Sequence, residues 1–187
     1  MRNVGSAVTE TSSPSRLAKF RQDYNALFQR ADQDQIREDL RTFFGPRADK
    51  YLAIYEKMRI GNKSYTPGWN WVVFFTAFPW FFYRKMYIFG SLLIFLPALA
   101  SYLFGFTGNA GLAGALAVSA NSQYVQSGMR RLQKADELGL IGERRQEYLR
   151  RAGGVSILAG TLTGILFALL VAAVIVGAYL DYHKSAH

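Results

Sequence analysis

Three long stretches of this 187-residue chain carry no charged side chain, and they constrain its fold more than any other feature. They comprise residues 64–83, 86–129 and 152–180, with lengths of 20, 44 and 29 residues. A helix that crosses a lipid bilayer needs roughly 20 mainly apolar residues. The second stretch can therefore hold two such helices and the third can hold one. This predicts an all-α, polytopic helical membrane protein with about three transmembrane helices.

The composition excludes several kinds of chemistry. Cysteine is absent, and the only two histidines, His183 and His187, lie in the last five residues. Disulfides and thiolate ligands are therefore excluded, and neither a multi-histidine metal site nor a serine–histidine catalytic pair is expected. No phosphate-loop, zinc-protease, hydrolase or calcium-loop motif occurs. We predict no cofactor, no metal and no enzymatic activity.

The formal net charge of +9 favours a partner with acidic groups, either lipid head groups or nucleic acid. Residues 1–66 hold 12 basic and 8 acidic residues, which are interleaved rather than clustered. Interleaved charge is typical of a solvated helix surface. We therefore expect acidic membrane lipids as partners and no nucleic acid.

The first third of the chain is predicted to stay in water. Residues 1–15 are rich in Ser and Thr and are predicted to be a disordered tail without a signal peptide. Residues 16–66 are predicted to form a cytosolic amphipathic helical region, with helix ends at Gly45-Pro46 and Gly61-Asn62. Its apolar positions at helical spacing are Phe20, Tyr24, Leu27, Phe28, Ile36, Leu40, Phe43, Phe44, Tyr51, Tyr55 and Met58. So small a region makes a poor core alone, so its apolar faces should also pack on bilayer, membrane helices or a second protein.

Residues 67–85 form an aromatic segment that holds all three tryptophans of the chain. A straight helix over residues 69–83 would rise about 22 Å, which is less than the roughly 30 Å hydrocarbon core, and Pro79 interrupts it. We predict an interfacial or re-entrant helical segment, with a kinked and tilted span as the alternative. Tryptophan, tyrosine and basic residues favour the head-group level. The predicted lipid-anchoring residues are Trp69, Trp71, Trp80, Tyr83, Arg84 and Lys85.

The aromatic segment also carries a recognisable motif, NWxxFFxxxPWFFYRKMYxxG, at residues 70–90. It resembles a bacterial family of small inner-membrane proteins, the domain-of-unknown-function family 2628. Ala120, Asn121 and Tyr124, and the pair Gly153-Gly154, are similar to that family as well, whereas Phe78-Pro79 stands where the family usually has Gly-Pro. The resemblance covers roughly residues 60–180. It implies a membrane fold and a bacterial inner-membrane location, and no established reaction.

Residues 86–125 are predicted to form a two-helix transmembrane hairpin with its turn at residues 105–109. The second helix is rich in small residues, including Gly111, Gly114 and Ala117, which let neighbouring helices approach closely. We therefore place it at the centre of the bundle. Its polar residues Asn121, Gln123 and Tyr124 are expected to make interhelical hydrogen bonds, and the alternative is a small polar pocket in the membrane.

Residues 126–152 are predicted to be a cytosolic basic helical segment, which Gly139 and Gly142 split into two helices. Residues 153–180 are predicted to form the C-terminal transmembrane helix, followed by a short tail at residues 181–187. This helix carries a four-residue repeat of small side chains, at Ser156, Gly160, Gly164, Ala168 and Ala172. We expect this small-residue stripe to pack on the alanine-rich helix, with self-association as the alternative.

The basic residues indicate an orientation in the membrane. Cytosolic loops of membrane proteins carry an excess of Lys and Arg. This rule places the N-terminus, Arg84-Lys85 and residues 130–151 in the cytosol, and the C-terminus in the periplasm. It requires that the aromatic segment enter and leave on the same side. The alternative of four full spans would move both termini to the cytosol.

These features favour a non-catalytic integral membrane protein of the bacterial inner membrane. Short spans, small-residue faces and amphipathic helices are all contact features, so we expect an accessory, scaffold or assembly subunit of a larger membrane complex. Its expected partners are acidic lipids and other membrane-protein subunits. The alternative is a small oligomeric transporter, channel or lipid-handling protein. A membrane enzyme is disfavoured.

Overall fold

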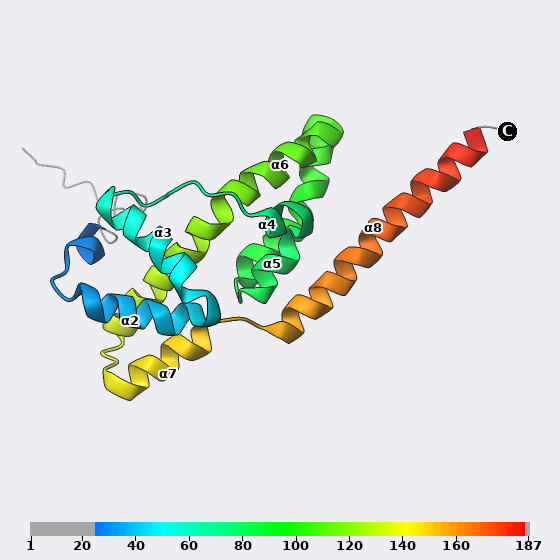
Figure 1. Ribbon diagram of the computed structural model, residues 1–187. Helices are drawn as coiled ribbons and strands as arrows, with labels where there is room; N and C mark the ends of the chain where they lie inside the picture. The colour runs from blue at the N-terminus through cyan, green and yellow to red at the C-terminus, as the bar shows by residue number, and fades with distance from the viewer. Residues whose placement is uncertain (1–24, 186–187) are drawn as a thin grey trace, which may run out of the picture.

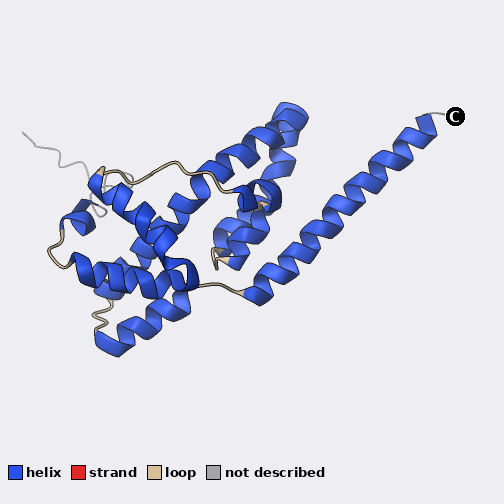
Figure 2. Ribbon diagram, viewed as in Figure 1, coloured by secondary structure: helices blue, strands red, loops and turns tan. Residues whose placement is uncertain are grey.

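The computed structural model describes residues 25–185, apart from the side chains of residues 98 and 104–107. Every regular element in this range is helical, which confirms the predicted all-α class (Figure 2). After helical residues 25–29 come α2 (Gln33–Phe44), the 3-10 helix η1 (Gly45–Arg47), α3 (Ala48–Ile60), α4 (Trp71–Thr76), α5 (Phe78–Tyr83), α6 (Tyr87–Glu137), α7 (Gly142–Ala152) and α8 (Ile157–Ser185). The predicted tail at residues 1–15, with Phe20 and Tyr24, lies outside the described residues.

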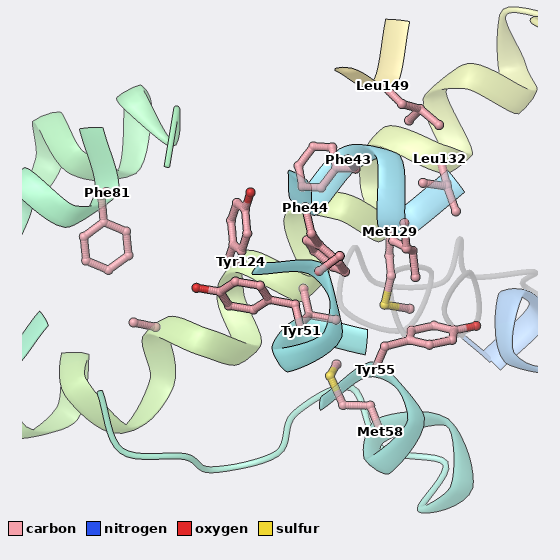
Figure 3. Close-up of a cluster of buried hydrophobic side chains, with 14 of the residues drawn as sticks. Phe43, Phe44, Tyr51, Tyr55, Met58, Phe81, Tyr124, Met129, Leu132 and Leu149 are labelled. Atoms are coloured by element: carbon pink, nitrogen blue, oxygen red, sulfur yellow. The ribbon is translucent and has the colours of Figure 1, made fainter. Parts of the chain in front are cut away.

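The apolar faces of α2 and α3 form one core with the C-terminal part of α6 and with α7 (Figure 3). The predicted positions on α2 and α3 are all buried, because their 3.6-residue period puts them on one side of each helix. Tyr124, Met129 and Leu132 of α6 and Leu149 of α7 complete this core. The partner that these amphipathic helices required is therefore another part of the same chain.

Helix α6 is assigned as one helix of 51 residues, yet it doubles back on itself. The side chain of Asn109 donates a hydrogen bond of 2.6 Å to the hydroxyl of Ser101, although eight residues of straight helix span about 12 Å. Residues 86–92 also line the same cavity as residues 123–134. Figure 1 shows the two arms meeting at the upper end of the body.

Helices run through two of the predicted segment boundaries. Helix α6 runs through the predicted boundary between membrane and cytosolic segments at residue 125 and ends at Glu137, two residues before Gly139, whose φ angle is 63°. The predicted division between Gly139 and Gly142 is confirmed, since α7 begins at Gly142. Similarly, α8 continues through the predicted tail to Ser185, where basic side chains in its last turn suit a helix C-terminus.

The aromatic segment forms two helices of six residues each, α4 and α5. Each rises about 9 Å, so neither can cross a bilayer alone. The break lies at Ala77, whose φ angle is 47°, and Pro79 occupies the first turn of α5, where its missing N–H is tolerated. The side chain of Asn70 caps α4 by accepting a hydrogen bond of 3.3 Å from the amide of Val73.

Helix α8 extends away from the rest of the molecule (Figure 1). Its N-terminal turns pack on α5, where the rings of Phe78 and Phe167 lie 5.7 Å apart. From Ala168 to its end every side chain is exposed. Of the described helices, α8 alone is long and apolar enough to cross a membrane, and the apolar arm Tyr87–Leu103 of α6 is shorter.

Candidate functional site

The most unusual side chain of the described chain is Arg84, which follows α5 and is only 4% exposed. Its guanidinium carbon lies 4.9 Å from the ring centres of both Tyr51 and Tyr124, and 5.5 Å from that of Tyr83. One Nη atom donates a hydrogen bond of 2.9 Å to the Tyr51 hydroxyl. The aromatic faces therefore supply the negative electrostatic potential that holds this cation.

Arg84 has no acidic partner within residues 25–185. None of the ion pairs found there includes Arg84. Its Nε atom is buried and has no hydrogen-bond partner. A buried cation without a counter-charge is costly, and tyrosine rings and one hydroxyl offset only part of that cost.

Two more cations lie beside Arg84 around a cleft between η1, α3, α4, α5 and α8. The cleft has a volume of about 460 Å³, and Arg47, Lys50 and Arg84 all line it. Burial lowers the pKa of the Lys50 amine, and the positive charges of Arg84 and Arg47 lower it further. The wall of the cleft is thus rich in positive charge. No aspartate or glutamate is among its lining residues.

A pair of buried amides fixes the aromatic segment against α6. Asn70 donates a hydrogen bond of 3.0 Å to the side-chain oxygen of Asn121, and Asn121 donates one of 3.4 Å to the carbonyl of Gly68. The next residue of α6, Ser122, donates a hydrogen bond from its hydroxyl to the carbonyl of Thr66. These bonds fix the segment before α4 to α6, and so they help to position α4.

The three predicted intramembrane polar residues do not converge on one pocket. Asn121 faces Asn70, whereas Gln123 donates to the hydroxyl of Ser119 in its own helix and lines a different cavity. Tyr124 donates to the carbonyl of Gly154 at 3.2 Å and places its ring over Arg84. Successive helix positions point about 100° apart, so adjacent polar residues in one helix reach different surroundings.

We predict that Asn121→Leu will lower the free energy of unfolding by about 2 kcal/mol, because it leaves the buried Asn70 amide without its partner. The measurement is denaturant unfolding of the full chain in detergent micelles. Gln123→Leu is the matched control, since it loses only a bond within α6. Equal losses for the two variants would contradict the proposed anchoring of the aromatic segment.

The six predicted anchoring residues are divided between surface and core. Trp69 and Trp71 are exposed, and their ring centres lie 5.1 Å apart. Trp71 also stacks on the exposed ring of Phe75. Trp80 is instead buried against Phe81, so its assignment as a surface anchor is wrong. The break at Ala77 is the reason, because it separates the mostly exposed helix α4 from α5, whose residues Phe78, Trp80 and Phe81 are buried.

Lys85 and Tyr83, the remaining predicted anchors beside Arg84, have structural contacts as well. Lys85 donates a hydrogen bond of 3.1 Å to the carbonyl of Arg151 at the end of α7. The carbonyl of Tyr83 accepts one of 2.8 Å from the amide of Ser156, just before α8. These bonds connect the end of α5 to the segment that joins α7 and α8.

The predicted packing of the small-residue stripe on the alanine-rich arm of α6 is wrong. At Gly160 an added Cβ atom would lie 2.9 Å from the ring of Tyr83, so this glycine serves contact with α5. Gly164, Gly111 and Gly114 have no other atom within 4 Å of an added Cβ, and Ala168 and Ala172 are exposed. Ala117 is buried, but α5 lies between α6 and α8 and contacts both.

Sequence reasoning selected Arg84 but missed Arg47, Lys50 and Tyr51, which share its cleft. Tyr51 lies 33 positions before Arg84 on an amphipathic helix, and no local pattern connects the two. Comparisons with protein-family models, with curated proteins and with solved structures find no match to this chain. The resemblance of residues 70–90 to the family named above therefore stays a prediction.

Proposed function

We propose that the protein is a non-catalytic integral membrane protein of the bacterial inner membrane, which serves as an accessory, scaffold or assembly subunit of a larger membrane complex. The observation that carries this proposal is α8, a long apolar helix whose second half contacts no other described part of the chain. Exposing so much apolar surface to water would be strongly unfavourable, and insertion of the helix into a lipid bilayer removes that free-energy cost.

About three transmembrane helices and a re-entrant aromatic segment belong to this proposal. The two arms of α6 supply two spans, and the outer face of the first arm carries exposed Ile88, Phe95 and Leu103. The arms meet at an uncharged end, whereas Lys85, Arg130 and Arg131 lie around one cavity at the other end. This asymmetry supports a cytosolic N-terminus and a periplasmic C-terminus.

The accessory role rests on surfaces that the chain leaves unused. Ala168 and Ala172 form the free part of the small-residue stripe, and both are exposed in the described molecule. Small residues at four-residue spacing allow close approach of another helix in a membrane. The exposed aromatic residues of α4 add a second contact surface at the head-group level.

Native co-purification tests the accessory role. Extraction in a mild detergent should yield the chain inside an assembly much larger than 21.0 kDa. Ala168→Leu should release the chain from that assembly, because it adds bulk to the exposed part of the stripe and does not touch the cleft. Gly177→Leu is the matched control, because Gly177 also has free space around it and lies on the opposite side of α8. A monodisperse single chain without partners, or equal effects of the two substitutions, would overturn the proposal.

A lipid-handling function is the second candidate, and it is favoured over a transporter or channel by the cleft at Arg84. The cleft is open to the outside next to the first turns of α8 and carries a surplus of positive charge. An open cleft with positive charge suits the binding of an acidic lipid better than it suits a transport pathway through the membrane.

A further inference from the structure

The cleft between η1, α3, α4, α5 and α8 has two chemically different ends. Arg47, Lys50 and Arg84 contribute its positive charge from the bundle side. The other side is lined by residues of α8 that are mainly apolar, with one threonine: Ile157, Gly160, Thr161 and Gly164. Gly164 lies about 6 Å further along the helix than Gly160, so the apolar wall continues along α8 away from the cations.

The cationic end of the cleft lacks a negative charge among the described residues that would neutralise it. Arg84 is buried with an unpaired Nε atom, and no acidic side chain of the described residues neutralises it. The pKa of Lys50 is also lowered, because its exposed side chain is still partly desolvated and two arginines lie nearby. A bound anion would remove both costs, and it would raise the pKa of Lys50 toward its ordinary value.

We propose that this cleft binds the phosphate group of one acidic glycerophospholipid, whose acyl chains follow the apolar wall of α8. A phosphate oxygen accepts hydrogen bonds from arginine and lysine with favourable charge. The inference rests on the proposed membrane location, because that location supplies the lipid and the bilayer edge next to Ile157.

The shape of the cleft favours a lipid over a free anion. Free phosphate would use only the cationic end and would leave the groove beside Gly160, Gly164 and Val72 empty. At Gly164 no atom lies within 4 Å of an added Cβ, so there is room for an acyl chain along that side of the helix. A single lipid neutralises the cations with its phosphate and covers the apolar wall with its acyl chains.

The test uses the full chain in a neutral detergent, with native mass spectrometry as the readout of lipid binding. Dioleoyl phosphatidylglycerol is the acidic lipid, dioleoyl phosphatidylcholine is the neutral comparison, and inorganic phosphate is the free anion. One phosphatidylglycerol per chain is expected to bind about tenfold more tightly than phosphatidylcholine. Inorganic phosphate at millimolar concentration should not displace it.

Arg84 is packed among aromatic rings, so its replacement would change the fold as well as the charge. We therefore substitute Arg47 and Lys50, which are exposed. The double variant Arg47→Gln/Lys50→Gln should bind phosphatidylglycerol about tenfold more weakly. Lys57→Gln is the control, because Lys57 is exposed on the same helix and does not line the cleft.

Three results would overturn the lipid site. They are the absence of bound phosphatidylglycerol, an effect of Lys57→Gln as large as that of the double variant, and competition by inorganic phosphate at equal affinity, which would identify a free-anion site instead. The membrane role is measured separately, by retention of the chain in alkali-washed membranes. A chain that stays in the membrane but binds no lipid would reject only the lipid site.

Discussion

Gly153→Ala is expected to destabilise the protein by about 3 kcal/mol, one of the two largest effects that the structure predicts for a single substitution. A Cβ atom at this position would overlap the carbonyl oxygen of Phe43 and approach its ring at 2.7 Å. The oxygen belongs to the backbone and already accepts a hydrogen bond of 2.6 Å from Gly154, so it cannot move aside freely.

The measurement is denaturant unfolding of the variant in detergent micelles, beside Gly164→Ala. That control adds the same methyl group where no atom lies within 4 Å, inside a helix that favours alanine over glycine, and it should leave stability unchanged or slightly higher. Equal stability of the Gly153 variant and the parent chain would show that the contact between Gly153 and Phe43 is absent.

The Gly153 substitution should also disturb the position of α8. The segment between α7 and α8 is tied to three other elements, because Gly154 bonds to Phe43 of α2, Tyr124 of α6 donates to Gly154, and Ser156 bonds to Tyr83 of α5. These three hydrogen bonds connect the segment before α8 to α2, α5 and α6. Displacing them should shift α8 relative to the cleft.

Arg145→Leu is the second substitution with a large expected effect, a loss of about 3–5 kcal/mol of stability. The Nε atom of Arg145 donates to the carboxylate of Asp39 at 2.6 Å, and Asp39 is fully buried. Without the arginine, two glutamine amides, from Gln35 and Gln146, remain to compensate the buried negative charge. An uncompensated buried carboxylate is strongly destabilising.

Arg144→Leu is the matched control, since Arg144 is the exposed neighbour on α7, and it should change stability by less than about 0.5 kcal/mol. Asp39→Leu combined with Arg145→Leu should recover part of the loss, because it removes both buried charges together. If the double variant were less stable than Arg145→Leu alone, the ion pair itself would be the stabilising element.

Local patterns along the chain determined the helices and many of their ends. The apolar faces of α2 and α3, the end of α3 before Gly61, the break between Glu137 and Gly142, and the apolar length of α8 all follow from residues within one or two turns. Periodicity and helix breakers act over that distance, so the sequence alone is enough to predict them.

Tertiary structure alone decided which faces meet. Asp39 and Arg145 are 106 positions apart, and Tyr51 and Arg84 are 33 apart, so no sequence period brings either pair together. The break at Ala77 separates α4 from α5, which carries the buried Trp80 and lies between α6 and α8, and this leaves the small-residue stripe largely free. Long-range pairing depends on how all helices fit at once, and that is the physical reason why the cleft at Arg84 became visible only in the folded chain.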